Sequence, residues 1–326
     1  MKDEIIHELM KIRDEERKIL EGNQEIEKSI YTNNKEFVVD SNLMLEKGKL
    51  MDIRPHTRFL QFPKHKHNYI EIIYMCVGKT THIIDSDNEI VLEQGDLLFL
   101  NKNSYHEIMP ASKDDIAINF IVLPEFFDVA FRMMEEENVV RDFLIGSLKQ
   151  TTSETNYMLF KLADVLTVQN LIENMVWSLL NKQTDNRQIN QTTMGLLLLE
   201  LLRNTEKIEQ NGQNQYERKL VFTVLRHIEE NYRNANLSLL AEEYNQPIYY
   251  LSKLVKQSTG HTYKELLQVK RLNQASYLLS STGLSISDII SAVGYDNTSY
   301  FHRVFKERYG VTPKEYRKKT TVVNSN

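Results

Sequence analysis

The chain has 326 residues, of which 41% are hydrophobic and 26% are charged, and its formal net charge is −5 at pH 7. This composition is typical of a globular protein with two or three domains. Its single cysteine, Cys76, excludes an internal disulfide and a thiolate metal cluster. The first residues lack the basic-then-apolar order of a secretory signal, and the longest apolar run, Met194 to Leu202, is far shorter than the roughly 20 residues of a membrane span. We therefore expect a cytoplasmic protein that does not bind membranes.

Residues 1–35 predict a highly charged helical arm. Its apolar residues follow an interrupted heptad spacing, at Ile5, Leu9, Ile12, Ile19, Ile26 and Ile30. Because Glu16 and Asn23 break the stripe, it is too weak for a strong zipper. We expect the arm to pack on its own domain or on a partner protomer, with a short coiled coil as the alternative.

Residues 36–166 predict a small β-barrel. Short β-rich runs alternate with turn residues such as Gly78 and Gly95. The expected strands are Tyr69–Val77, Thr80–Ile84, Glu89–Leu92, Asp96–Leu100 and Ile116–Val122, with a last strand at Leu159–Val165. Many closely spaced strands favour closure into a barrel.

Three histidines and a glutamate form a candidate binding site in this barrel. If His65, His67 and Glu71 occupy one strand, their odd spacing places all three on one face. His106 on a neighbouring strand completes a three-histidine, one-carboxylate set suited to Zn, Mn, Fe or Ni. The simpler interpretation, which we favour, is that these side chains line a polar pocket for an organic effector. A divalent metal is the only cofactor that the sequence suggests.

The same residues resemble the two cupin motifs. His65-Lys66-His67 through Glu71, followed by Gly78, resembles the first motif, and Gly95 with His106 resembles the second. Asparagines replace the usual proline and glycine of the second motif, so the potential ligands are kept while their scaffold is altered. The resemblance implies a cupin-like, effector-binding barrel.

Residues 167–204 predict a helical segment, with helices near Val168–Leu180 and Gln191–Leu202. The second helix is apolar on nearly every side, so more than one of its faces must be covered. A homodimer interface is the interpretation we favour, and burial within the chain is the alternative. The polar stretch 205–216, rich in Asn, Gln and Glu, predicts a linker.

Residues 217–320 contain one helical unit twice. Positions about 50 residues apart are identical, namely Tyr250/Tyr300, Lys256/Lys306, Gly260/Gly310, Thr262/Thr312, Lys264/Lys314 and Glu265/Glu315. Each copy predicts helix, tight turn, helix: the first runs from Asn236 or Ser238 through Tyr244 and then over Ile248–Ser258, and the second from Ser285 to Val293 and then from about Asn297 to Tyr309. Asn245 and Gly294 supply the positive φ that each corner requires. A helix over Tyr263–Ser280 separates the copies as a strut of roughly 25 Å.

Charge is distributed unevenly along the chain. Residues 215–320 carry 16 lysines and arginines against 10 aspartates and glutamates, a net +6, whereas the preceding residues are net −11. Excess positive charge on duplicated helices favours binding to DNA phosphates, which release counterions when they are neutralised. A solvated basic face would carry the same imbalance, so the charge supports the DNA interpretation without establishing it. Two reading helices on one strut could enter successive major-groove segments about 34 Å apart, so each protomer would read two unlike half-elements.

Three runs near the C-terminus carry a family signature: Ile289 to Tyr295, Ser299 to Lys306, and Tyr309 to Arg317. Together they resemble AraC/XylS-type transcription regulators, and Leu272 to Leu279 resembles the connecting helix of that family. The resemblance implies that the side chains facing base edges are Tyr249, Ser252 and Lys253 in the first copy and Thr298, Ser299, His302 and Arg303 in the second. We expect Lys256 and Lys306 to hold phosphates without reading sequence.

We therefore predict an α+β multidomain protein: an N-terminal cupin-like β-barrel with flanking helices and a C-terminal all-α double helix-turn-helix domain. The predicted function is sequence-specific DNA binding and transcription regulation, without enzyme activity, under the control of a small molecule in the barrel. By the family resemblance, a sugar is the suggested class of effector. Double-stranded DNA, a second copy of the chain and RNA polymerase are the expected partners. The alternative is a cupin metalloenzyme, or a metal sensor, fused to a DNA-binding domain.

Overall fold

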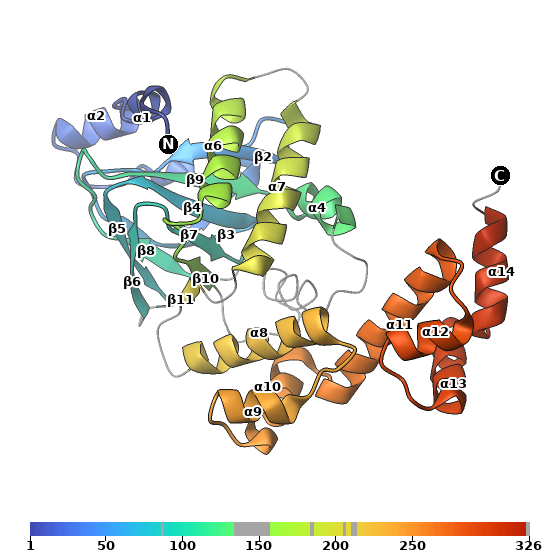
Figure 1. Cartoon of the computed structure of the whole chain (residues 1–326). Helices are drawn as coiled ribbons and strands as arrows, with labels where there is room; N and C mark the ends of the chain where they lie inside the picture. Colours follow the sequence, from blue (N-terminus) through green and yellow to red (C-terminus); the bar gives the residue numbers. More distant parts are fainter. Residues whose placement is uncertain are drawn as a thin grey trace. The chain divides into compact units, whose positions relative to one another are not determined.

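The computed structural model describes residues 1–85, 88–102, 104–133, 157–182, 186–204, 207–209 and 214–323. The chain forms two compact units (Figure 1): the N-terminal unit comprises Met1–Glu136 and Leu144–Lys219, and the C-terminal unit comprises mainly Leu220–Asn326. The sheets lie in the N-terminal unit, and the described part of the C-terminal unit is helical. Among the described residues, no helix combines the length and the apolar character that a membrane crossing requires.

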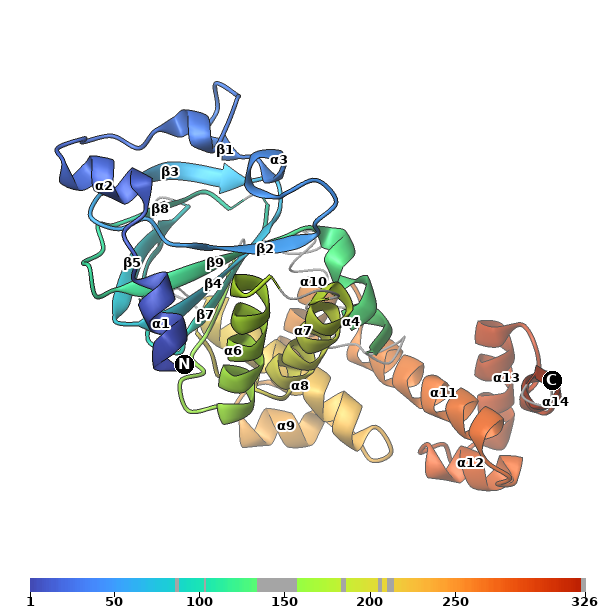
Figure 2. The same ribbon diagram turned by 90° about the horizontal axis from the view of Figure 1, so that it is seen from above.

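The N-terminal arm folds as two short helices, α1 (Asp3–Leu9) and α2 (Asp14–Leu20), followed by a 3-10 turn at Lys28–Ile30. The extended backbone of Arg13 separates the two helices. Ile5, Leu9, Ile19 and Ile26 are buried, which explains the apolar positions of the interrupted stripe. The arm packs on its own unit: α1 lies beside helix α6 (Figure 2), where the terminal amino group approaches Glu173 at 3.4 Å.

Two sheets face each other in the N-terminal unit. Within the described residues, one sheet has the strand order β1-β3-β8-β5-β6 and the other β11-β10-β7-β4-β9-β2. The strands are β1 (Val38–Val39), β2 (Met51–Pro55), β3 (Phe62–His67), β4 (Ile70–Val77), β5 (Lys79–Ile84), β6 (Asn88–Glu93), β7 (Leu97–Leu100), β8 (His106–Ile108), β9 (Ile116–Val122), β10 (Tyr157–Phe160) and β11 (Ile208–Glu209). The sequence pattern gives no bounds for β3 and β8, although it places His65, His67 and His106 on strands, and it does not predict β2. The strand predicted at Leu159–Val165 is misplaced, since β10 ends at Phe160.

Strand β4 is the centre of the larger sheet. It pairs with β7 on one side and β9 on the other, and residues 70–76 are all buried. A continuous apolar run suits a strand that is covered on both faces. Ile73 and Met75 point into the main core with Ile84 and Leu98, while Tyr74 donates a hydrogen bond to Gln169 of α6. Helix α6 therefore covers the outer face of this sheet.

The helical segment consists of α6 (Leu166–Leu180) and α7 (Asn186–Arg203), which pack on each other, with α7 also packing on α4 (Asp128–Met133). Helix α7 buries Met194, Leu197, Leu198 and Leu201 within this chain. These four side chains therefore need no partner protomer to cover them. Apolar side chains nevertheless remain on the surface of the two helices, at Trp177, Ile189 and Leu196. Part of the predicted linker 205–216 lies outside the described residues, and the rest is structured: it contains β11 and the start of α8 (Asn214–Asn231).

The C-terminal unit contains the helix-turn-helix unit twice. Its helices after α8 are α9 (Leu237–Glu243), α10 (Ile248–Thr259), α11 (Tyr263–Ser281), α12 (Ile286–Ala292), α13 (Thr298–Tyr309) and α14 (Pro313–Val323). Helices α9 and α10 form the first copy, α12 and α13 form the second, and α11 runs from one to the other (Figure 1). The predicted duplication and strut are therefore correct to within a few residues at each end.

Three of the six identical pairs cap helices. Gly260 and Gly310 end α10 and α13 in the left-handed conformation, with φ of 76° and 74°. Thr262 and Glu265 form a capping box at the start of α11, and Thr312 and Glu315 make the same three hydrogen bonds at the start of α14. A capping box satisfies backbone N–H groups that the first helical turn leaves without partners. The sequence repeat thus marks where helices begin and end.

Both corners have the predicted positive φ, 49° at Asn245 and 85° at Gly294. A steric constraint also requires glycine at position 294. A Cβ atom added there would lie 2.3 Å from the carbonyl oxygen of Arg233, which belongs to the segment after α8. The second copy therefore packs directly against the backbone of that segment.

We expect Gly294→Ala to destabilise the C-terminal unit by more than about 2 kcal/mol, because it combines left-handed strain with a backbone clash. Gly310→Ala is the matched control: it has φ of 74° but no heavy atom within 4 Å of an added Cβ, so we expect a loss of about 1 kcal/mol from strain alone. Urea unfolding followed by circular dichroism measures both. Equal losses would show that the approach to Arg233 does not constrain the fold.

A buried ion pair between Glu16 and Arg58 joins the arm to the barrel. Arg58 donates to both carboxylate oxygens of Glu16, at 2.8 and 2.9 Å, and both side chains are almost fully buried. Burial opposes the charged form of Glu16, but the hydrogen bond from Arg58 and the charge of Arg13 outweigh it and lower the pKa of Glu16 to about 2. The folded-state pKa lies below the ordinary value of 4.5. The pair therefore stabilises the fold above pH 4.5, and this stabilisation is lost as the pH falls towards 2.

We expect Glu16→Gln to lower the free energy of unfolding of the N-terminal unit by about 3 kcal/mol at neutral pH, because Arg58 stays buried without a counter-charge. The difference from the unmodified protein should shrink as the pH falls below about 4.5. Denaturant unfolding at a series of pH values measures it. The control is Glu8→Gln on α1, which removes an exposed ion pair with Lys11. It should change the free energy of unfolding little. A Glu16→Gln effect that is constant from neutral to acidic pH would contradict this account.

Candidate functional site

The two predicted reading helices, α10 and α13, each present a polar surface. Tyr249 is 77% exposed, Lys253, Thr298, Ser299 and Arg303 are exposed, and Ser252 and His302 are half-buried. Lys256 and Lys306 are exposed in the last turns of the same helices. The opposite faces are core: Leu251, Leu254, Phe301, Val304 and Phe305 are buried. All nine side chains expected to touch DNA are therefore at least partly accessible.

Helix α11, which joins the two copies, is held against α8. The Nζ atom of Lys270 lies 2.5 Å from the Glu229 carboxylate of α8, and both side chains are largely buried. Arg271 donates to the carbonyl oxygens of Tyr232 and Arg233, at 2.8 and 3.0 Å. Lys270 and Arg271 therefore hold the helices together.

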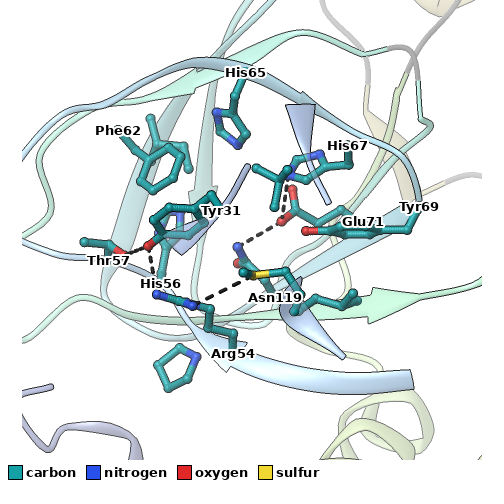
Figure 3. Close-up of a pocket in the computed structure, with 15 residues that line it drawn as sticks. Tyr31, Arg54, His56, Thr57, Phe62, His65, His67, Tyr69, Glu71 and Asn119 are labelled. Atoms are coloured by element: carbon teal, nitrogen blue, oxygen red, sulfur yellow. Dashed lines mark hydrogen bonds and ion pairs between the residues drawn. The ribbon is translucent and has the colours of Figure 1, made fainter. Parts of the chain in front are cut away.

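The four predicted residues come together, but from three strands instead of two: His65, His67 and Glu71 line the barrel pocket (Figure 3), and His106 lies beside them. His65 and His67 lie on β3, His106 lies opposite His65 on β8, and Glu71 lies on β4 in the other sheet. The prediction that Glu71 shares a strand with His65 and His67 is therefore wrong, because the chain turns at residues 68–69. Burial of both sheets' inner faces still brings the four side chains together.

The geometry of this cluster is compact. Ligand atoms of His65, His67 and His106 lie within 4.8 Å of one another. The Glu71 carboxylate oxygens approach Nε2 of His67 and Nε2 of His106, each at 3.4 Å, and Asn119 donates to Glu71 at 3.0 Å. Nδ1 of His65 contacts the carbonyl oxygen of Pro63 at 2.8 Å. The arrangement aims nitrogen and oxygen donors at one small volume.

Two further histidines extend the cluster. The rings of His56, His82 and His106 stack in a column, with centroid separations of 5.5 and 5.8 Å and nearly parallel planes. His56 follows β2 and His82 lies on β5, so neither matches a spacing motif. Their separation along the chain explains why the sequence analysis misses them. Only the pairing of strands shows that all five histidines share one interior.

Burial determines the charge of the pocket. It lowers the pKa of His65 to about 4 and of His56 to about 3, and it lowers the pKa of His67 and His106 as well. Burial also raises the pKa of Glu71 to about 8. At neutral pH the histidines are therefore neutral and Glu71 carries a proton. Within the described residues, no hydrogen-bond partner reaches Nδ1 of His67, either ring nitrogen of His106 or Oε2 of Glu71. Buried polar atoms without partners are costly, so this arrangement favours a site for a ligand.

The mouth of the pocket is polar and borders the arm. Arg54 and Tyr31 line it, and both bind the Glu15 carboxylate of α2, with Arg54 at 3.0 Å and the Tyr31 hydroxyl at 2.7 Å. The cavity has a volume of about 30 Å³. This is comparable to the volume of one water molecule. A sugar does not fit unless the arm or the lining side chains move, whereas an ion does.

Comparison with known proteins agrees with this division of the chain. A model of the AraC-like ligand binding domain matches residues 53–127, and a helix-turn-helix domain model matches residues 240–319. The fold and the two matched domains define a DNA-binding transcription regulator with a ligand-binding domain. The chain belongs to the AraC family of transcription regulators.

Individual relatives are distant over most of the chain, and a higher identity occurs over a shorter stretch. The transcriptional activator RhaS of Mannheimia succiniciproducens is 24% identical over 257 residues, which are 78% of this chain and 89% of the relative. The xylose operon regulatory protein of Escherichia coli is 43% identical over 67 residues, 21% of this chain and 17% of the relative. Among solved structures, the C-terminal domain of AraT, a response regulator of Geobacillus stearothermophilus, is 35% identical with a TM-score of 0.30, covering 31% of this chain and 84% of that domain.

Proposed function

We propose that each protomer reads two unlike DNA elements on one face of a duplex, about one helical turn apart. The observation that carries this proposal is the placement of α10 and α13 at the two ends of α11 with their polar sides exposed. The 19 residues of α11 span about 28 Å, which is close to the turn-to-turn spacing of the major groove. Arg303 and Lys253 are the proposed guanine readers, and Lys256 and Lys306 the proposed phosphate contacts.

The proposed control is exerted from the barrel. Occupation of the pocket formed by His65, His67, Glu71 and His106 changes the arrangement of the arm and helices around it, and so changes DNA binding. The effector must bind one arrangement more tightly than the other for this to occur. The arm supports this proposal, because Glu15 of α2 binds Arg54 and Tyr31, which line the pocket.

The exposed apolar side chains of α6 and α7 support a homodimer as the acting form. Trp177, Ile189 and Leu196 are 39%, 59% and 44% exposed on these two adjacent helices. Because RhaS and RhaR are named transcriptional activators, RNA polymerase is a proposed partner of this chain as well. We also propose that the protein acts in the cytoplasm and has no enzyme activity.

A divalent metal is the second candidate occupant of the barrel. Three imidazoles and a carboxylate are ordinary ligands of Zn, Fe, Ni and Mn, and the unpartnered nitrogens of His67 and His106 fit such an ion. His65, His67 and His106 would hold it, with Glu71 as the fourth ligand, and the small cavity favours it over a sugar. The bound ion would supply a charge and fixed ligand geometry, which makes metal sensing the corresponding function.

Selection of bound DNA from a random pool tests the reading mechanism. We expect two unequal elements about one turn apart, with affinity that falls steeply with salt. Arg303→Ala should relax preference in one element and Lys253→Ala in the other, each by roughly 1–3 kcal/mol at the affected base pair. Lys47→Ala, in the N-terminal unit, is the control and should change neither element. A variant that relaxes both elements equally would contradict the assignment of one copy to each.

Metal analysis of the purified full-length chain tests the second candidate. After incubation with Zn²⁺ and gel filtration, we expect about one ion per protomer, its loss in His106→Ala, and its retention in His7→Ala on the exposed arm helix. Retention in both variants would place the ion elsewhere. No bound ion in the unmodified protein would leave an organic effector as the occupant.

A further inference from the structure

A second hollow lies in the N-terminal unit, outside the barrel. Its walls come from the segment 46–52, which leads into β2, and from the facing ends of α6 and α7. The volume is about 320 Å³, roughly ten times that of the barrel pocket. Small-molecule sites begin at about 300 Å³. The hollow is therefore large enough for a ligand with a single ring.

The charges around the hollow are not balanced. Lys49 lies 2.9 Å from Asp52 and 3.2 Å from Glu46, so this group of one cation and two carboxylates carries a net charge of −1. Lys182 and Arg187 also line the hollow. Within the described part of the chain, neither forms an ion pair. Arg187 lies in the first turn of the 18-residue helix α7, where the helix dipole adds positive potential. This side of the hollow is therefore suited to an anion.

A buried polar side chain forms part of the wall. Asn190 lies one turn after Arg187 on α7, lines the hollow, and is only 2% exposed. No group among the described residues donates a hydrogen bond to its Oδ1 atom. A buried amide oxygen without a donor costs about 1–3 kcal/mol. A ligand with a hydroxyl or N–H group would supply the missing donor.

The rest of the lining is apolar. Leu50, Met51, Phe126 and Leu179 contribute to it, and Phe126 is held in place because Gln191 of α7 donates to its carbonyl oxygen at 3.1 Å. The hollow thus offers cationic, hydrogen-bonding and apolar surfaces together. This combination differs from the barrel pocket, which is made of neutral histidines and a glutamate.

We infer that this hollow is a second ligand site, which takes a small organic anion with an apolar body and a hydrogen-bond donor. Its carboxylate lies against Arg187, Lys182 and the start of α7, and its donor reaches Oδ1 of Asn190. The apolar part covers Met51 and Phe126. The site belongs to the face where β2 meets α6 and α7, which is separate from the pocket that holds His65 and His106.

Isothermal titration of the full-length protein with 4-hydroxyphenylacetate tests this site, because the probe carries a carboxylate, a ring and a hydroxyl donor. We expect saturable binding at one site per protomer. Phenylacetate lacks the donor and 4-hydroxyphenylethanol lacks the anion, so each should bind at least tenfold more weakly. Failure of 4-hydroxyphenylacetate to bind, or equal binding of all three compounds, would overturn the inference.

Variants locate the bound probe. Arg187→Gln and Asn190→Leu should each weaken binding at least tenfold, whereas Arg203→Gln, an exposed position at the other end of α7, should not. Arg187 is exposed, so its variant should remain folded even if Asn190→Leu does not. Binding that survives Arg187→Gln but is lost in His106→Ala would place the probe in the barrel and contradict a second site.

Discussion

The arrangement of the DNA-reading surface depends on how one helix, α11, is held by the helices around it. On one side, Lys270 pairs with Glu229 of α8, and Arg271 binds the carbonyl oxygens of Tyr232 and Arg233 just after α8. At the second copy, Tyr309 of α13 donates to Asn273 at 3.1 Å, and Leu272, Ala275 and Leu279 enter the core that holds Phe301 and Phe305. These contacts fix α11 against α8 and against the second copy, and α10 packs on α11 as well. Rotation of either reading helix about α11 would therefore disturb packed contacts. A fixed relation between two readers is what allows one protomer to recognise two elements at one spacing.

The duplicated sequence predicts this region well because its repeated residues have local roles. Gly260 and Gly310, and the Thr-Glu pairs that follow them, end one helix and begin the next through contacts over a few residues. Such signals depend on backbone chemistry alone, so the sequence is enough to find them. The side chains expected to read bases differ between the copies, as they should if the two elements differ. The roles of Lys270 and Arg271 could not be predicted, because their partners come from α8 and from the segment that follows it.

In the barrel, by contrast, contacts between residues far apart in the chain assemble the site, and local sequence patterns reveal only part of it. Spacing correctly brings His65, His67, Glu71 and His106 into one site, but it assigns Glu71 to the wrong strand. His56, His82 and Asn119 complete the interior through strand pairing over long distances in the chain, and no local pattern marks them. The arm is similar: Glu16 looks like an interruption of a heptad stripe, yet it is the buried partner of Arg58. Charged residues that break an apolar pattern can thus be the ones that fix tertiary structure.

The central claim is that α11 holds the two reading helices at a fixed distance. Changing the spacing between the two DNA elements tests it most directly. The affinity of the protein for a duplex with the selected elements is measured before and after insertion of half a turn, about 5 base pairs, and of a full turn, about 10 base pairs, between them. A fixed α11 predicts that both insertions reduce affinity to that of a single element. Recovery of affinity with the full-turn insertion alone would show that the two copies move independently, and would contradict the account.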